Sequence, residues 1–304
     1  MGDNMKKNVI TGATSFIGVH LIKEWIKSNC EIYAIVRPNS SNIGRIIKDN
    51  KIHIIEADMN DYARFVNEIP KADFFYHLAW EGARRPYRDD VKIQKKNYAG
   101  AVNAMKLAEK LKCNFFLGSG SQAEYGVTNG LVDEDYPCHP DTEYGREKLH
   151  AYETLNKMAY KSGIKFIWTR IFSIYGRYDY SGTLIMSSLR KMKNDESIEM
   201  TEGTQLWDYL HVVDAAKAMK LFAQTQCDSG IYIVASGDYK PLNQFVREMK
   251  IITESKSELK FGSVPYGSAG PVNLMPNSEK IQKTLNWKPM ISFTTGIKDI
   301  YENM

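Results

Sequence analysis

Lys7-Asn8-Val9-Ile10-Thr11 leads without a break into Gly12-Ala13-Thr14-Ser15-Phe16-Ile17-Gly18. The first segment is short and apolar, as in a buried strand, and the residues after Gly18 place apolar side chains at helical spacing. A strand, a glycine turn and a helix form the phosphate cradle of dinucleotide-binding folds, because glycine lets backbone N–H groups approach a pyrophosphate. This stretch therefore predicts a dinucleotide site. The residues expected to contact the cofactor here are Gly12, Ser15, Phe16, Ile17 and Gly18.

Further apolar runs alternate with helical patterns as far as Arg170. The expected strands are Glu31–Val36, Ile52–Ala57, Asp73–Leu78, Asn114–Gly118 and Ile164–Arg170, with a long helix at Val91–Leu111. Regular alternation of this kind predicts an α/β fold with a Rossmann-type doubly wound parallel sheet. After Arg170 the elements become short, among them a helix at Leu184–Lys193 and a strand at Ile231–Ala235. We therefore expect a Rossmann domain over 1–172 and a smaller C-terminal substrate-binding lobe over 173–304, interleaved with it.

The end of the second expected strand bears on the choice of cofactor. A dinucleotide site usually places an acid there for the adenosine ribose, but this chain has Arg37 and Ser40, with no acid between Glu31 and Asp49. A guanidinium suits a 2′-phosphate, because it meets phosphate oxygens with two parallel hydrogen bonds. The alternative is a solvated surface arginine. We expect NADP(H) as the preferred cofactor, with NAD(H) as the alternative.

Ligands of parallel sheets lie at the carboxyl ends of the strands. Asp58 ends the third strand and is expected near the adenine edge, and Asn97 lies inside the long helix, either holding a water or simply exposed. The remaining cofactor contacts are expected at Met59, Leu78, Ala79, Trp80, Ser119, Tyr144, Lys148 and Ile171. The loop 82–90 carries Arg84, Arg85 and Arg88, which either reach the substrate's phosphates or form a solvated basic loop.

Tyr144 and Lys148 are four residues apart, and Thr142 is placed to cap the helix that would carry them. Side chains at this spacing lie on one face of a helix, so the ammonium of Lys148 is expected to lower the pKa of the Tyr144 phenol. A phenol tuned in this way exchanges a proton with a carbonyl oxygen. Ser121, at the carboxyl end of a buried strand, is the expected partner of Tyr144. The sequence thus predicts Ser121, Tyr144 and Lys148 as the catalytic residues.

Composition excludes several classes of protein. The 304-residue chain is 43% hydrophobic with a net charge of only +4, and no apolar run approaches the length of a membrane span. Such a charge tolerates an anionic ligand without indicating nucleic acid. The chain has four cysteines that lie far apart, at Cys30, Cys113, Cys138 and Cys227, and none of them forms a Cys-x-x-Cys pair. We expect a cytoplasmic protein with reduced thiols, no metal site, no membrane partner and no nucleic-acid partner.

The chain resembles the extended short-chain dehydrogenases/reductases, in the group of nucleotide-sugar epimerases, dehydratases and reductases. The resemblance covers nearly the whole chain. It rests on the glycine turn, Asp58, His77-Leu78-Ala79, Asn97, Ser121 before Tyr125-Gly126, the Tyr144/Lys148 pair, Arg170-x-Phe-x-x-Tyr-Gly, the run Gln205–Asp214 and Leu285–Pro289. It implies that Tyr144 is the acid/base, that Lys148 tunes it and holds the nicotinamide ribose, and that Ser121 binds the sugar oxygen. We expect a nucleotide-sugar substrate and a homodimer.

Departures from the family pattern reduce the number of reactions that the chain is expected to catalyse. Dehydratases of the group carry Asp-Glu after the Ser/Thr, and the 3,5-epimerising reductases carry a Cys there; here these positions are Gln122 and Ala123. We therefore expect NADPH-dependent reduction of the 4-keto group of a nucleotide-linked (6-deoxy)hexose in polysaccharide sugar biosynthesis. The alternatives are an NAD-dependent nucleotide-sugar 4-epimerase and a non-catalytic NADP(H)-binding module.

Two further departures concern the substrate pocket. Ser173 replaces an Asn that often holds the nucleotide phosphates, and Leu206-Trp207 replaces a common Arg before Asp208. Trp207 either stacks on a base or packs within the lobe. The expected substrate contacts are Arg84, Gln122, Ser173 and Trp207.

Overall fold

The computed structural model describes residues 5–267 and 270–304. The chain divides into two compact units. The first consists of Met1–Gly126, Pro137–Ile171 and Ala216–Tyr232, and the second of Val127–Tyr136, Phe172–Ala215 and Ile233–Met304. The chain therefore passes between the two units several times.

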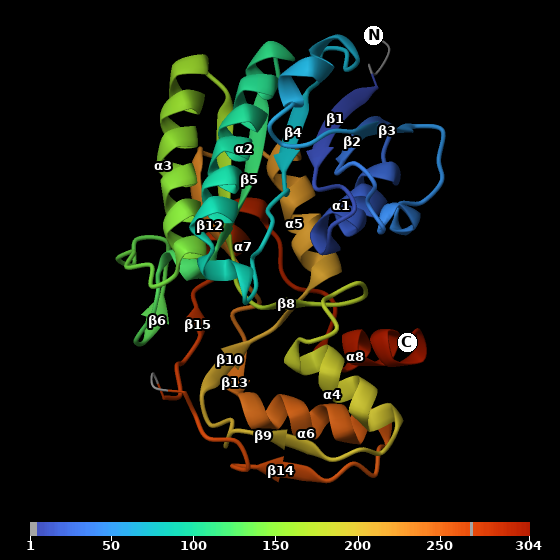
Figure 1. Ribbon diagram of the computed structural model, residues 1–304, viewed down its shortest axis with the longest axis vertical. Helices are drawn as coiled ribbons and strands as arrows, with labels where there is room; N and C mark the ends of the chain where they lie inside the picture. Colours follow the sequence, from blue (N-terminus) through green and yellow to red (C-terminus); the bar gives the residue numbers. More distant parts are fainter. Residues whose placement is uncertain (1–4, 268–269) are drawn as a thin grey trace. The chain divides into compact units, whose positions relative to one another are not determined.

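A seven-stranded sheet forms the frame of the first unit (Figure 1). Its strand order is β12-β7-β5-β4-β1-β2-β3, and the pairs from β7 to β3 are parallel. Its strands are β1 (Lys6–Thr11), β2 (Cys30–Val36), β3 (Ile52–Glu56), β4 (Phe74–His77), β5 (Phe115–Ser121), β7 (Lys165–Ile171) and β12 (Gly230–Val234). This confirms the doubly wound sheet, with the order reversing direction between β1 and β4.

Two expectations about strands were wrong. The strand near residue 231, expected in the smaller lobe, is β12 and forms an edge of the main sheet. The strand expected to end at Gly118 continues to Ser121, because residues 119–121 pair with β7 as far as Ile171. Its small residues had suggested a loop, but a fully buried central strand accommodates them beside Trp168.

Polar caps set the helix starts. Ser15 caps α1 (Phe16–Ile26), Asp90 caps α2 (Val91–Lys110) and Thr142 caps α3 (Glu143–Ser162), each accepting from a backbone N–H of the first turn. The α2 and α3 helices lie side by side, and Lys220 of α5 (Val212–Gln224) donates to Glu24 O at the end of α1 (Figure 1). Short 3-10 turns are η1 (Ile43–Arg45), η2 (Tyr62–Asn67), η3 (Tyr87–Asp89) and η4 (Gln122–Glu124).

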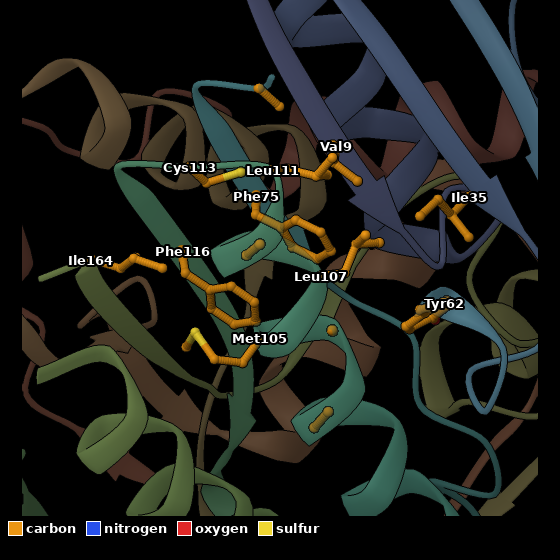
Figure 2. Packing of buried hydrophobic residues seen from close by; sticks show 14 of the residues in the cluster. Val9, Ile35, Tyr62, Phe75, Met105, Leu107, Leu111, Cys113, Phe116 and Ile164 are labelled. Carbon is orange, nitrogen blue, oxygen red and sulfur yellow. The ribbon is translucent and has the colours of Figure 1, made fainter. Parts of the chain in front are cut away.

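The core between the sheet and helices α2 and α3 is aromatic and aliphatic (Figure 2). Phe75 of β4 and Phe116 of β5 stack with ring centroids 5.2 Å apart, and Met105 and Leu107 of α2, with its C-cap residue Leu111, pack over them. Burial of this kind, at about 25 cal/mol per Å² of apolar surface, is the main term that holds the strand ends in place.

The second unit consists of short elements, as expected after Arg170. Its strands are β6 (Leu131–Val132), β8 (Ile174–Tyr175), β9 (Ile198–Met200), β10 (Leu206–Asp208), β11 (Leu210–His211), β13 (Tyr239–Pro241), β14 (Leu259–Phe261) and β15 (Met275–Pro276). Its helices are α4 (Leu184–Lys193), α6 (Leu242–Thr253), α7 (Glu279–Leu285) and α8 (Phe293–Glu302). In the described part of the chain, no helix has the length and apolar character to cross a membrane.

Candidate functional site

The glycine turn lies where β1 and β4 end side by side, at the reversal of the strand order. Gly12 has φ +65°, and a Cβ on it would lie 2.7 Å from Ala79 N, so only glycine fits there. A Cβ on Gly18 would collide with Gly12 O. The turn is therefore packed tightly against the end of β4, while its open side faces a cavity. Ser15 Oγ accepts from Gly18 N at 3.1 Å and fixes the first turn of α1.

A cavity of about 270 Å³ opens at this point in the first unit. Its wall contains nine of the expected cofactor contacts: Gly12, Ser15, Arg37, Ser40, Asp58, Met59, Leu78, Ala79 and Trp80. It also contains residues that the sequence did not indicate: Thr14, Ile35, Val36, Asn42, Ala57, Tyr62 and Glu81. The glycine cradle and the mixed polar and apolar wall fit the adenosine and pyrophosphate parts of a dinucleotide. Phe16, Ile17 and Gly18 are in the adjoining first turn of α1, and Ile171 ends β7.

The two charged side chains expected at the cofactor site, Arg37 and Asp58, lie in the wall of this cavity. Arg37 is 67% exposed, and its Nη1 lies 3.9 Å from Glu81 Oε1. Asp58 pairs with Lys96 at 3.0 Å and accepts from Asn60 N. Burial acts to raise the pKa of Asp58, but the Asn60 N–H and Lys96 outweigh it and hold the pKa below its ordinary value. Both expected side chains thus line the cavity, each beside an opposite charge.

Asn97 does something that neither sequence alternative described. It is fully buried, so it is not exposed; its Oδ1 accepts from Glu81 N at 2.8 Å and its Nδ2 donates to Glu81 O at 2.7 Å. Gln94, which the sequence analysis missed, donates to Gly82 O and Tyr87 O and accepts from Trp80 Nε1 at 2.8 Å. Together these two α2 side chains hold the loop after β4. Their spacing with buried Ala101 and Ala104 was a usable signal that both face inward.

Lys148 is buried between two groups. Its Nζ donates to Ser119 O at 2.5 Å and lies 3.7 Å from the centre of the Trp80 ring. Burial lowers the pKa of Lys148 to about 7, although the charge of Glu124 opposes this. The expected Tyr144–Lys148 proximity is confirmed, since Nζ lies 5.8 Å from the Tyr144 ring centre.

The expected direction of the Tyr144 pKa was wrong. Burial raises the pKa of Tyr144 above its ordinary value, more than a hydrogen bond with Ser121 and the charge of Arg88 lower it. Spacing alone indicated an ammonium near the phenol, but it did not reveal that burial acts on both groups. Ser121 acts on Tyr144 as expected, since its hydroxyl lowers the pKa of the phenol.

A buried carboxylate behind Ser121 was missed. Glu124 is fully buried, accepts from Ser121 N at 2.7 Å and pairs with Arg170 Nε at 2.8 Å. It also accepts from Trp168 Nε1 at 3.0 Å. Ser121 and Glu124 form a capping box, a pattern that Ser-x-x-Glu in the sequence indicates directly. This network fixes the backbone from which Ser121 reaches Tyr144.

The arginine loop of the first unit also lies against the phenol. The Arg88 guanidinium carbon is 5.1 Å from the Tyr144 ring centre, and the charge of Arg84 acts on Tyr144 as well. Gln122 begins the 3-10 turn after Ser121. In the second unit, Ser173 O accepts from Leu210 N, and the Trp207 ring lies 6.5 Å from that of Tyr209.

The family model described as "NAD dependent epimerase/dehydratase family" matches residues 8–235. The chain belongs to this family. It is 27% identical to "CDP-abequose synthase" of Salmonella muenchen over 98% of both chains, and 25% identical to a "Putative UDP-glucose 4-epimerase" of Methanocaldococcus jannaschii over 96% of both. It is therefore a nucleotide-sugar-modifying enzyme of the extended short-chain dehydrogenase/reductase family, an oxidoreductase or an epimerase.

Solved structures share the fold. UDP-glucose 4-epimerase of Thermotoga maritima, solved with UDP-glucose, has a TM-score of 0.88 at 19% identity and covers 97% of both chains. UDP-glucuronic acid 4-epimerase of Bacillus cereus, in complex with NAD, has a TM-score of 0.84 at 19% identity with the same coverage.

Proposed function

We propose that this enzyme reduces the 4-keto group of a nucleotide-linked 6-deoxyhexose with NADPH. The observation that carries the proposal is the placement of Ser121 and Lys148 beside Tyr144, in the same unit as the glycine-turn cavity. A serine hydroxyl and a phenol that meet in this way hold a carbonyl oxygen between them, and the phenol gives it a proton. A bound nicotinamide cofactor would supply the hydride to the carbonyl carbon.

The residues after Ser121 favour reduction over water loss. Elimination needs an acid and a base at neighbouring carbons. Gln122 and Ala123 supply neither the Asp-Glu pair of a dehydratase nor the Cys of a 3,5-epimerising reductase. The relative named CDP-abequose synthase, which makes a CDP-linked sugar by its name, supports a nucleotide-sugar substrate for this chain.

The polar side of the cavity supports the proposed preference for NADP(H) over NAD(H). Arg37 stands with the hydroxyls of Thr14 and Ser40, which lie 3.2 Å apart, where a 2′-phosphate would find hydrogen-bond donors and a positive charge. The nearby Glu81 carboxylate is the observation that favours the second candidate, an NAD-dependent 4-epimerase, because it repels a phosphate and already pairs with Arg37. The relatives named as UDP-glucose 4-epimerases favour it too.

The two candidates are separated by the absorbance of the purified protein and by one assay. A reductase is expected to purify without tightly held nucleotide and to oxidise added NADPH in the presence of a nucleotide-4-keto-6-deoxyhexose. An epimerase is expected to retain NAD(H) and to interconvert UDP-glucose and UDP-galactose without net cofactor consumption. Saturable NADPH binding with neither reaction, over a panel of CDP-, dTDP-, UDP- and GDP-sugars, would instead indicate the non-catalytic binding module.

A further inference from the structure

The ammonium of Lys148 is buried without a carboxylate partner of its own. Lys148 is only 2% exposed, and within the part of the chain that the structure describes it forms no ion pair. The carboxylate whose charge favours the ammonium is that of Glu124, which is itself paired with Arg170 at 2.8 Å. Because water does not reach a charge in this position, contacts within the protein must compensate it.

One carbonyl and the faces of aromatic rings surround this ammonium instead. Lys148 Nζ donates to Ser119 O at 2.5 Å. It lies 3.7 Å from the centre of the Trp80 ring, against 5.8 Å for the Tyr144 ring and 5.9 Å for the Trp168 ring. A cation is attracted to the negative face of an aromatic ring, most strongly to tryptophan and when the cation is removed from water. Trp80 therefore makes the closest aromatic contact and stands where a counterion would otherwise be needed.

The indole of Trp80 is itself held in one orientation by α2. Its Nε1 donates to Oε1 of the fully buried Gln94 at 2.8 Å, and an indole N–H is only a donor, so the amide oxygen must face it. The amide nitrogen of Gln94 donates to Gly82 O and to Tyr87 O, both at 2.9 Å, and its oxygen also accepts from Asn97 Nδ2 at 3.2 Å. These partners leave one orientation for the Gln94 amide, which fixes the indole in turn.

A fixed ring is important here because a lysine ammonium is carried by a flexible four-carbon chain. Trp80 forms part of the cavity wall proposed to hold the dinucleotide, and Lys148 is proposed to contact the nicotinamide ribose. The bond to Ser119 O alone would leave the ammonium free to turn about that oxygen. The ring face supplies the second contact that keeps it in one place.

We infer that Trp80 is a positioning residue for Lys148, whose ammonium it holds by its ring face at the place where the nicotinamide ribose and Tyr144 are to be met. The inference rests on the proposed role of Lys148 toward the cofactor. Because Trp80 acts through Lys148, the contributions of the two side chains to nucleotide binding must depend on each other.

A double-mutant cycle measures this dependence without any sugar substrate. Binding of NADP⁺ and of NAD⁺ is titrated by calorimetry at about pH 6, below the pKa of about 7 of Lys148, in wild type, Trp80→Leu, Lys148→Met and the double variant. With Lys148 present, Trp80→Leu is expected to weaken both nucleotides about tenfold, the effect of losing a buried contact between a cation and a ring. In the Lys148→Met background the loss should be less than about twofold. Trp80→Phe, which keeps a ring, should retain most of the affinity.

Met59→Ala is the matched control, since Met59 lines the same cavity but packs against Gly100 of α2. Its effect on nucleotide binding is expected to be the same with and without Lys148. Circular dichroism checks that each variant is folded.

Three outcomes would overturn the inference. The first is an equal loss from Trp80→Leu in both backgrounds, because the ring would then contact the nucleotide directly or act only on the fold. The second is a Trp80→Phe variant that binds as weakly as Trp80→Leu, and the third is a Lys148→Met variant that binds both nucleotides like wild type. The nicotinamide ribose is common to both nucleotides, so a wrong cofactor preference or a wrong sugar substrate leaves the result on Trp80 intact.

Discussion

Glu124 accepts a hydrogen bond from the backbone N–H of Ser121 at 2.7 Å, and the hydroxyl of this serine acts on Tyr144. The same carboxylate pairs with Arg170, and both side chains are almost completely shielded from water. A buried charge pair is costly to break, because the remaining ion has no solvent to stabilise it. The stability of the fold and the position of Ser121 therefore both depend on the Glu124 carboxylate.

Replacing this carboxylate tests that dependence. Glu124→Gln is expected to lower the free energy of unfolding by about 3–5 kcal/mol, the usual effect of leaving a buried partner charge uncompensated. Urea unfolding measures it. The double variant Glu124→Leu/Arg170→Met should be more stable than Glu124→Gln, because no charge is left buried. A loss below ~1 kcal/mol in the single variant would contradict this account.

Removal of the phenol oxygen tests the proposed acid/base. Tyr144→Phe is expected to lower kcat by at least ~10²-fold, the usual contribution of a positioned proton donor, with cofactor affinity nearly intact. Steady-state kinetics and nucleotide titration measure the two effects. Tyr160→Phe, at an 89% exposed position of the same helix, is the control. Retention of more than a tenth of wild-type kcat in Tyr144→Phe would remove Tyr144 from the mechanism.

The buried ammonium of Lys148 links stability to pH. Its pKa is about 7 in the folded protein, against about 10.4 in an unfolded chain. The unfolded chain therefore binds more protons between these values, and the contribution of Lys148 to stability becomes more favourable as pH rises from about 7 to about 10. The stability of wild type relative to Lys148→Met is expected to increase over this window. A difference that does not change with pH would show that the lysine keeps its charge when folded.

Lys148→Ala should also weaken turnover and cofactor binding together, since both the field at Tyr144 and a proposed ribose contact are lost. Activity assays and titration with NADPH separate the two. A loss of cofactor affinity alone would assign Lys148 to binding only.

A buried histidine predicts sensitivity to acid. His77 Nδ1 forms a 2.8 Å hydrogen bond with Thr11 Oγ1, and burial lowers the pKa of His77 to about 3. Between about pH 6.5 and 3 the unfolded chain binds the proton and the folded one does not, so stability falls on acidification, by about 2 kcal/mol at pH 5 from this group. His77→Asn should flatten this slope. The exposed His53→Asn is the control, and equal slopes for wild type and His77→Asn would reject the assignment.

Arg37 separates the two candidate reactions. A charge-assisted bond to a 2′-phosphate is worth roughly 1.5–3 kcal/mol, so Arg37→Ala is expected to weaken NADPH about 10- to 100-fold and to leave NADH almost unchanged. Glu81→Gln should strengthen NADPH, because it removes the competing carboxylate. The preference should shrink with salt, since Arg37 is largely exposed. If the wild-type enzyme already binds NADH more tightly than NADPH, the 4-epimerase becomes the favoured candidate over the reductase.

The sequence predicted the parts of the site that depend on local pattern. Gly12, Gly18 and the Thr142 cap follow from rules that act within a few residues, and the structure places them as expected. The pKa of Tyr144 and the role of Asn97 depend on burial and on partners distant in sequence, which spacing does not supply. Glu124 lies between these cases, because its capping box is a local pattern whereas its ion pair with Arg170 spans 46 residues.

The contact between Trp80 and Lys148 has an optical consequence. Trp80 forms part of the cavity wall, and its indole ring also holds the ammonium that belongs to the proposed reaction centre. Indole emission overlaps the absorption of reduced nicotinamides, so a dinucleotide bound in that cavity would quench Trp80 by energy transfer. The enzyme thus contains its own fluorescent reporter of cofactor loading, and Trp80→Phe identifies its share of the signal.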